Sequence, residues 1–154
     1  MNLKWLVHFD LHETTDSDFL EFTPAKAARD GELEFKNDAI PDGFYTIGYA
    51  LDPKPDFYKA IIDSVRKETH IAPPDENGEI IGLKQVQDGV VYDSSEAKIY
   101  CDTLTGAEYV TTTEVYPDSK SKNVTNEECN KAQLAAVVGG LDYILSQKWD
   151  GYLC

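Results

Sequence analysis

Apolar and polar side chains alternate over residues 3–11, which predicts a β-strand near the start of the chain. One face of this strand is apolar or aromatic: Leu3, Trp5, Val7, Phe9 and Leu11. Because successive side chains of a strand point to opposite faces, His8, Asp10 and His12 are expected to share the other face.

Four more segments have strand character. Residues 44–51 and 107–116 are rich in β-branched and aromatic side chains, and short apolar pieces at 80–83 and 89–92 predict two shorter strands. Residues 16–43 are polar and contain several prolines and glycines, so this segment is expected to be mostly loop, with room for a short helix at 25–29. A loop of that length inside a compact domain is more often functional than idle.

Two helices are predicted from apolar side chains that recur at helical spacing. The first opens at Pro53 and Pro55 and runs to about Lys67. The second opens with a capping box, Thr125-x-x-Glu128, and carries an apolar stripe to about residue 147. Strands that alternate with helices predict one α/β domain over residues 1–154, a three-layer sandwich with a mixed sheet.

Composition narrows the classes of partner. With a net charge of -14, the chain lacks the basic surface that binding to nucleic acids or anionic membranes requires. Its acidic residues are scattered along the sequence, which favours a solvated acidic surface over a DNA mimic. The first ten residues lack the pattern of a signal peptide and no apolar run reaches about 20 residues, so a cytoplasmic protein is expected. The three cysteines, Cys101, Cys129 and Cys154, suggest neither a disulfide framework nor a zinc site.

The polar end of the first strand carries the candidate chemistry. His12 can offer an imidazole nitrogen to a metal while Asp10 orients the ring through its other nitrogen. A catalytic zinc usually has three protein ligands, and neighbours two apart on a strand, about 7 Å from each other, converge on one ion only with favourable rotamers. Spacing alone therefore favours an ordinary polar strand end over a metal site.

Glu114 is a carboxylate within an apolar and β-branched strand. Burial beside a metal-bound water would suit a general base, whereas an outward-facing residue on a half-exposed strand would need no such role. Glu114 alternates in phase with Val110, Thr112 and Tyr116, and this parity does not decide which face is buried.

Taken together, these motifs resemble a known family. Asp10-Leu11-His12-x-Thr14-Thr15 resembles the segment with the last zinc-ligating histidine of the zinc carboxypeptidase superfamily, in its aspartoacylase and succinylglutamate desuccinylase branch. Thr111-Thr112-Thr113-Glu114, followed by a terminal helix, resembles that family's catalytic-glutamate strand. The resemblance implies a zinc-dependent hydrolase of amide or peptide bonds, of carboxypeptidase or N-acyl amino acid deacylase type, with His12 as zinc ligand and Glu114 as general acid/base.

One departure from the family concerns the remaining ligands. The family takes its first two from a His-x-x-Glu motif upstream, but here His8, His12 and His70 are followed at the third place by Leu11, Thr15 and Pro73. The chain thus resembles the C-terminal half of such an enzyme. It is expected to be a fragment or split product, or else a homologue that has lost the chemistry and serves as an acidic binding module; a new site that recruits His8 is the least favoured alternative.

Two other residues are candidates for substrate binding, and each has a plainer alternative. Arg29 could reach a substrate carboxylate but is more readily a surface charge, and Tyr116 could donate to an oxyanion but is more readily a core or rim residue. The expected partners are a small peptide or N-acyl amino acid, with a second copy or a complementing chain left open.

Overall fold

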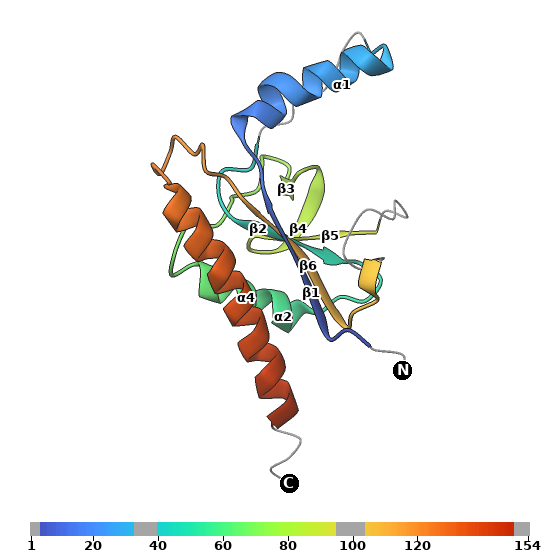
Figure 1. The fold of residues 1–154 in the computed structure, drawn as a ribbon, viewed down its shortest axis with the longest axis vertical. Coiled ribbons are helices and arrows are strands. Elements are labelled where there is room, and N and C mark those ends of the chain that lie inside the picture. The colour runs from blue at the N-terminus through green and yellow to red at the C-terminus, as the bar shows by residue number, and fades with distance from the viewer. Residues whose placement is uncertain (1–3, 33–39, 95–103, 150–154) are drawn as a thin grey trace.

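A six-stranded mixed sheet forms the centre of the protein, in the order β1-β6-β2-β5-β4-β3 (Figure 1). The computed structural model describes residues 4–32, 40–94 and 104–149. The strands are β1 (Val7–Glu13), β2 (Tyr45–Tyr49), β3 (Glu79–Ile80), β4 (Leu83–Gln87), β5 (Val90–Asp93) and β6 (Tyr109–Val115). The predicted α/β class with a mixed sheet is confirmed.

The sheet contains both parallel and antiparallel pairs of strands, and β6 takes part in one of each. β6 runs parallel to β1 and antiparallel to β2, and it separates these two strands although they are neighbours along the chain. β2 and β5 are parallel, and β3, β4 and β5 form an antiparallel meander. The predicted strands near 44–51, 89–92 and 107–116 are present. The strand predicted at 80–83 is wrong: these residues form the tight turn between β3 and β4, with positive φ angles at Ile81 and Gly82.

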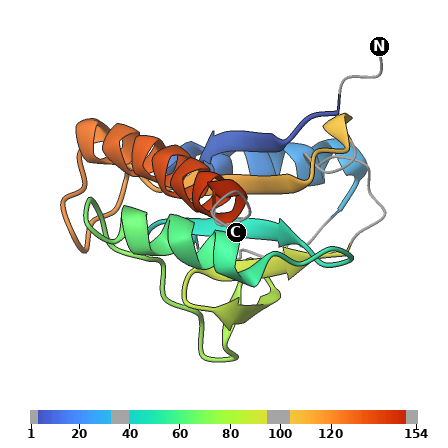
Figure 2. The same cartoon turned by 90° about the horizontal axis from the view of Figure 1, so that it is seen from below.

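Two helices, α2 (Pro55–Val65) and α4 (Asn126–Trp149), lie side by side on one face of the sheet (Figure 2). The main core lies between them and the sheet and includes Phe57, Tyr58 and Ile61 of α2 with Ala136 and Ile144 of α4. The predicted capping box opens α4: the hydroxyl of Thr125 accepts from Glu128 N–H, and the Glu128 carboxylate accepts from Thr125 N–H.

The opposite face of the sheet has two parts. A smaller core covers it over β2, β3 and β5, formed by Tyr45, Ile47, Ala72, Ile80 and Val91. Toward the carboxyl ends of β1 and β6 this face carries polar side chains instead. The chain thus places its candidate chemistry on the face that α2 and α4 do not cover.

The segment after β1 is helical, which corrects the expectation that residues 16–43 are mostly loop. A short helical turn of π type, η1 (Asp18–Phe22), leads directly into α1 (Thr23–Asp30), which Gly31 ends in the left-handed conformation at φ 75°. Among the residues of these two helices only Ala27 is buried. The short helix expected at 25–29 lies within α1. Residues 33–39, Cys101 and Cys154 lie outside the described part.

Candidate functional site

The register of β1 against β6 brings His12 next to Glu114. The two strands pair in parallel without interruption from Val7 and Tyr109 to Glu13 and Val115, and His12 and Glu114 are direct partners in this ladder. Side chains paired on adjacent strands point to the same face. Residues 102 positions apart along the chain therefore meet at the carboxyl end of the two parallel strands.

Three ionisable side chains form a row across this end of the sheet. The Nε2 atom of His12 lies 3.0 Å from Oδ1 of Asp10, and its Nδ1 atom lies 3.8 Å from Oε1 of Glu114. The imidazole thus stands between two carboxylates, and its own side chain is 54% exposed. The Asp10 contact is the arrangement by which a carboxylate fixes the tautomer and orientation of a histidine ring.

Glu114 is the buried member of the row, with a side chain only 13% exposed. Burial raises the pKa of this carboxyl, and the charges of Asp10 and Asp18 act in the same direction. The hydroxyl of Thr14, which donates to Oε2 of Glu114 at 3.1 Å, and the charge of His12 partly oppose the shift. The parity that the sequence left open is thereby settled: Glu114 shares the face of Asp10 and His12, opposite the helices.

Tyr116 lies just past β6 and anchors the segment that follows β1. Its hydroxyl donates to Oδ1 of Asp16 at 2.6 Å, and Lys120 donates to the other Asp16 oxygen at 3.1 Å. Burial, together with the hydrogen bond and charge of Asp16, raises the pKa of Tyr116 to about 12. The phenol is therefore committed to Asp16, a contact that sequence reasoning missed because the two residues are 100 positions apart.

Arg29 stands apart from this row. It lies near the end of α1, its side chain is 70% exposed, and its guanidinium donates to both carboxylate oxygens of the adjacent Asp30. Figure 1 shows α1 extending away from the sheet beyond the end of β1. The structure does not join Arg29 to His12 or Glu114.

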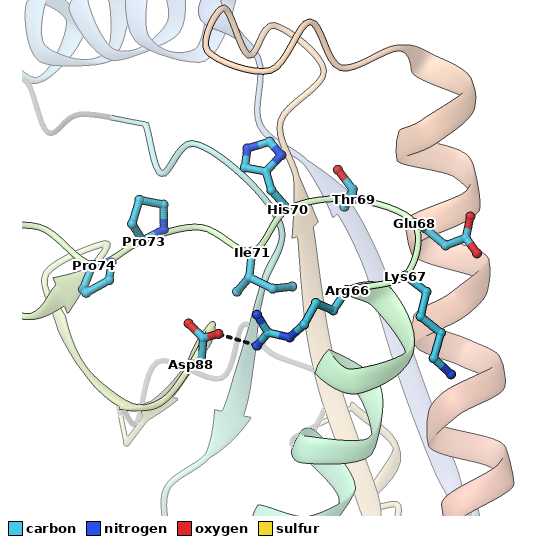
Figure 3. Close-up of a pocket in the computed structure, with 9 residues that line it drawn as sticks. All are labelled: Arg66, Lys67, Glu68, Thr69, His70, Ile71, Pro73, Pro74 and Asp88. Atoms are coloured by element: carbon cyan, nitrogen blue, oxygen red, sulfur yellow. Dashed lines mark hydrogen bonds and ion pairs between the residues drawn. The ribbon is translucent and has the colours of Figure 1, made fainter.

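Two hollows in the surface are large enough to be considered as places for a ligand. One of about 250 Å³ lies beside the end of β1 and is lined by Leu11, His12, Glu13, Val115, Cys129, Asn130 and Gln133. A larger and shallower one, about 610 Å³, lies past the end of α2 between Arg66 and the Pro73-Pro74 loop (Figure 3). In the larger hollow Arg66 is already paired with Asp88, and none of the predicted site residues lines it.

A zinc ion would find only part of a ligand set here. The row offers one imidazole, with Asp10 behind it, and the carboxylate of Glu114 beside it. Within residues 4–32, 40–94 and 104–149 no group of three His, Cys, Asp or Glu side chains is placed to hold one ion. Since protein zinc sites use three or four protein ligands, the described residues by themselves do not fit the metal.

Comparison with known proteins gives similarity of fold only. No protein family and no curated protein matches the chain. A solved structure named "putative metallopeptidase" from Shewanella denitrificans OS217 aligns over 69% of this chain at 15% identity, with a TM-score of 0.49. A second of the same name, from Shewanella amazonensis SB2B, aligns over 87% at 15% identity, with a TM-score of 0.48. This chain spans 38% and 40% of those two chains.

No helix in the described part of the chain is long and apolar enough to cross a membrane.

Proposed function

We propose that this chain carries the acid–base part of an amide-hydrolysing site of zinc metallopeptidase type, with Glu114 as general acid/base and His12 as a metal ligand. The observation that supports this most directly is the pairing of a buried carboxylate of raised pKa with an accessible imidazole at the end of two parallel strands. Perturbed carboxyl groups at such open ends are frequent catalytic bases.

Glu114 is suited to move a proton in both directions. A carboxyl group whose pKa lies above its ordinary value holds and releases a proton closer to neutral pH. The Thr14 hydroxyl occupies Oε2, so Oε1 is the oxygen that takes the proton from an attacking water and later delivers it to the leaving amine. The products of this proton transfer are a carboxylate and a free amine.

A zinc ion would need ligands in addition to His12, because the described residues supply too few. We therefore assign no step to the metal. Asp10 prepares His12 for ligation because it lies at Nε2, which leaves Nδ1 on the side of Glu114. The substrates proposed are small peptides or N-acyl amino acids.

The experiment is a paired measurement of zinc content and hydrolysis on purified full-length chain. Elemental analysis after dialysis against zinc should give bound metal that His12→Ala loses. Hydrolysis of a panel of N-acyl amino acids and dipeptides should fall about 10²–10⁴-fold in Glu114→Gln, the usual contribution of a general acid/base. Glu13→Gln, which changes an exposed glutamate next to His12 on β1, is the matched control and should behave as the wild type.

The incomplete ligand set favours a second candidate, a non-catalytic acidic binding module. That candidate predicts no zinc above background and no hydrolysis of any panel member. Finding both absent in the wild type would overturn the hydrolase proposal for this chain.

A further inference from the structure

β1 is an open edge of the sheet. It is the last strand of the order, and within the described residues only β6 pairs with it. Its seven residues contain no lysine, proline or glycine, and its register with β6 has no irregularity; Asp10 and Glu13 are its acidic residues. Natural edge strands usually carry such protective features, because free N–H and C=O groups otherwise attract another strand. The opposite edge strand, β3, has only two residues.

The backbone groups at this edge belong to the odd-numbered residues. Tyr109 N–H donates to Leu6 O, and Thr14 N–H donates to Val115 O. The even-numbered residues of β1 therefore bond to β6, and in a parallel ladder the odd-numbered ones face the other way. Phe9 and Leu11 thus present their N–H and C=O groups to the open edge.

An exposed leucine-rich stripe on α4 lies next to the same edge. Its members recur at helical spacing and are 38–63% exposed: Leu134, Val138, Leu141 and Leu145. α4 meets β1 through Gln133, which donates to His12 O at 2.7 Å, and through Gly140, which lies against Phe9. Gly139 faces Ser64 of α2. The stripe is on the side of α4 turned away from α2, and it forms one surface with the open edge, here called the edge surface.

We propose that a second copy of this chain docks on the edge surface, with the two β1 strands antiparallel. The midpoint of β1 is Asp10, so pairing over its full length sets Phe9 opposite Leu11 as a hydrogen-bonded pair. These are the residues whose backbone groups face the edge, so the backbone of the strand is complementary to itself in this register. The two-fold axis stands perpendicular to the sheet, which places both α4 helices on one face and brings their stripes together.

The extent of the edge surface suits a modest dimer. The strand edge is about 23 Å long at about 3.3 Å per residue, and the stripe from Leu134 to Leu145 is about 17 Å long at about 1.5 Å per residue. One sheet layer and one helix layer make it about 20 Å deep. A strip of about 23 Å by 20 Å covers about 460 Å² on each partner, less than the roughly 600 Å² at the lower end of stable interfaces, so the dimer is expected to be weak.

The same register sets Asp10 directly opposite its own copy, as a non-hydrogen-bonded pair whose Cβ atoms lie about 4.5–5.5 Å apart. The two carboxylates repel each other, so the dimer depends on the backbone hydrogen bonds of the strands and on the stripe of α4.

Sedimentation velocity of the full-length chain in EDTA tests the interface without metal. We expect a species of twice 17.2 kDa at tens of micromolar. Leu141→Lys should weaken the dimer at least tenfold by charging the stripe. Leu11→Pro should do the same by removing an edge N–H. Leu51→Lys makes the same change from an apolar to a charged side chain, but away from the edge surface, and should leave the dimer unchanged. A wild-type monomer, or a dimer that both edge-surface variants keep, would overturn the proposal.

Discussion

The raised pKa of Glu114 makes the stability of the fold depend on pH. Burial raises its pKa above the ordinary 4.5, so the folded protein keeps this proton to higher pH than the unfolded chain does. The stability that protonated Glu114 contributes is therefore fully present below the pKa of the unfolded chain. It is lost as the pH rises through the pKa of Glu114 in the folded protein.

Glu114→Gln is uncharged at every pH and should escape that loss. In EDTA its melting temperature should rise relative to the wild type between about pH 4 and pH 7, by a few degrees, since ~1 kcal/mol corresponds to about 2–4 °C in a chain of this size. Thermal unfolding across this range, with exposed Glu13→Gln as control, makes the measurement. A difference that does not vary with pH would show that Glu114 is not perturbed by burial.

Ionisation of the Tyr116 phenol should also change the stability of the fold, at alkaline pH. Because its pKa is raised to about 12, the stability that its neutral phenol contributes is full below about pH 10 and is lost between pH 10 and 12. Tyr116→Phe lacks the hydrogen bond to Asp16 and should melt about 2–4 °C lower at pH 8. Absorbance titration should also show one fewer late-ionising tyrosine. Tyr143→Phe serves as the comparison, and an unchanged titration curve in Tyr116→Phe would contradict the assignment.

The common face of Asp10 and His12 was predictable from the sequence, but the contacts of His12 and Tyr116 were not. Alternation along the first strand placed His8, Asp10 and His12 on one face, as observed for the row at the sheet end. The distance from His12 to Glu114 depends on which strands pair and in what register, and both are non-local. For the same reason the Asp16 partner of Tyr116 left no signal in the sequence.

At the scale of elements, a close approach at Gly140 holds α4 against β1. A Cβ atom there would lie 2.8 Å from Cζ of Phe9 and 2.9 Å from Cε2 of Phe57, both within the core. Gly140→Ala should therefore lower the free energy of unfolding by about 1–3 kcal/mol through overpacking, although alanine favours the helix itself. Chemical denaturation measures this, with the exposed helical position Asn130→Ala as control. A stabilised Gly140→Ala variant would mean that the aromatic rings yield easily.

The predictability of each element follows from how much of it is buried. α2, whose buried side chains recur at helical spacing, and β6, with its β-branched run, were recognisable from their own residues. Of η1 and α1 the sequence indicated only a short helix at 25–29, because the polar side chains, prolines and glycines of residues 16–43 favour a loop. The insertion of β6 between β1 and β2 is a matter of topology that local patterns do not encode.

At the scale of the whole molecule, net charge opposes the association that the edge surface favours. Each copy carries a net charge of -14, so two copies repel one another at long range. In the proposed register the Asp10 carboxylates of the two copies add to this repulsion, whereas the backbone hydrogen bonds and aliphatic side chains of the contact are weakened little by salt. Added salt should therefore strengthen the dimer.

The Debye length falls from about 30 Å at 0.01 M to about 10 Å at 0.1 M salt, which screens the repulsion between copies. Sedimentation equilibrium in EDTA should accordingly show a dissociation constant that decreases from 10 mM to about 300 mM NaCl, and Leu51→Lys should follow the same trend. Leu141→Lys should remain the weaker dimer at every salt concentration. Association that weakens with salt would instead indicate that opposite charges hold the copies together, which the apolar edge surface does not provide.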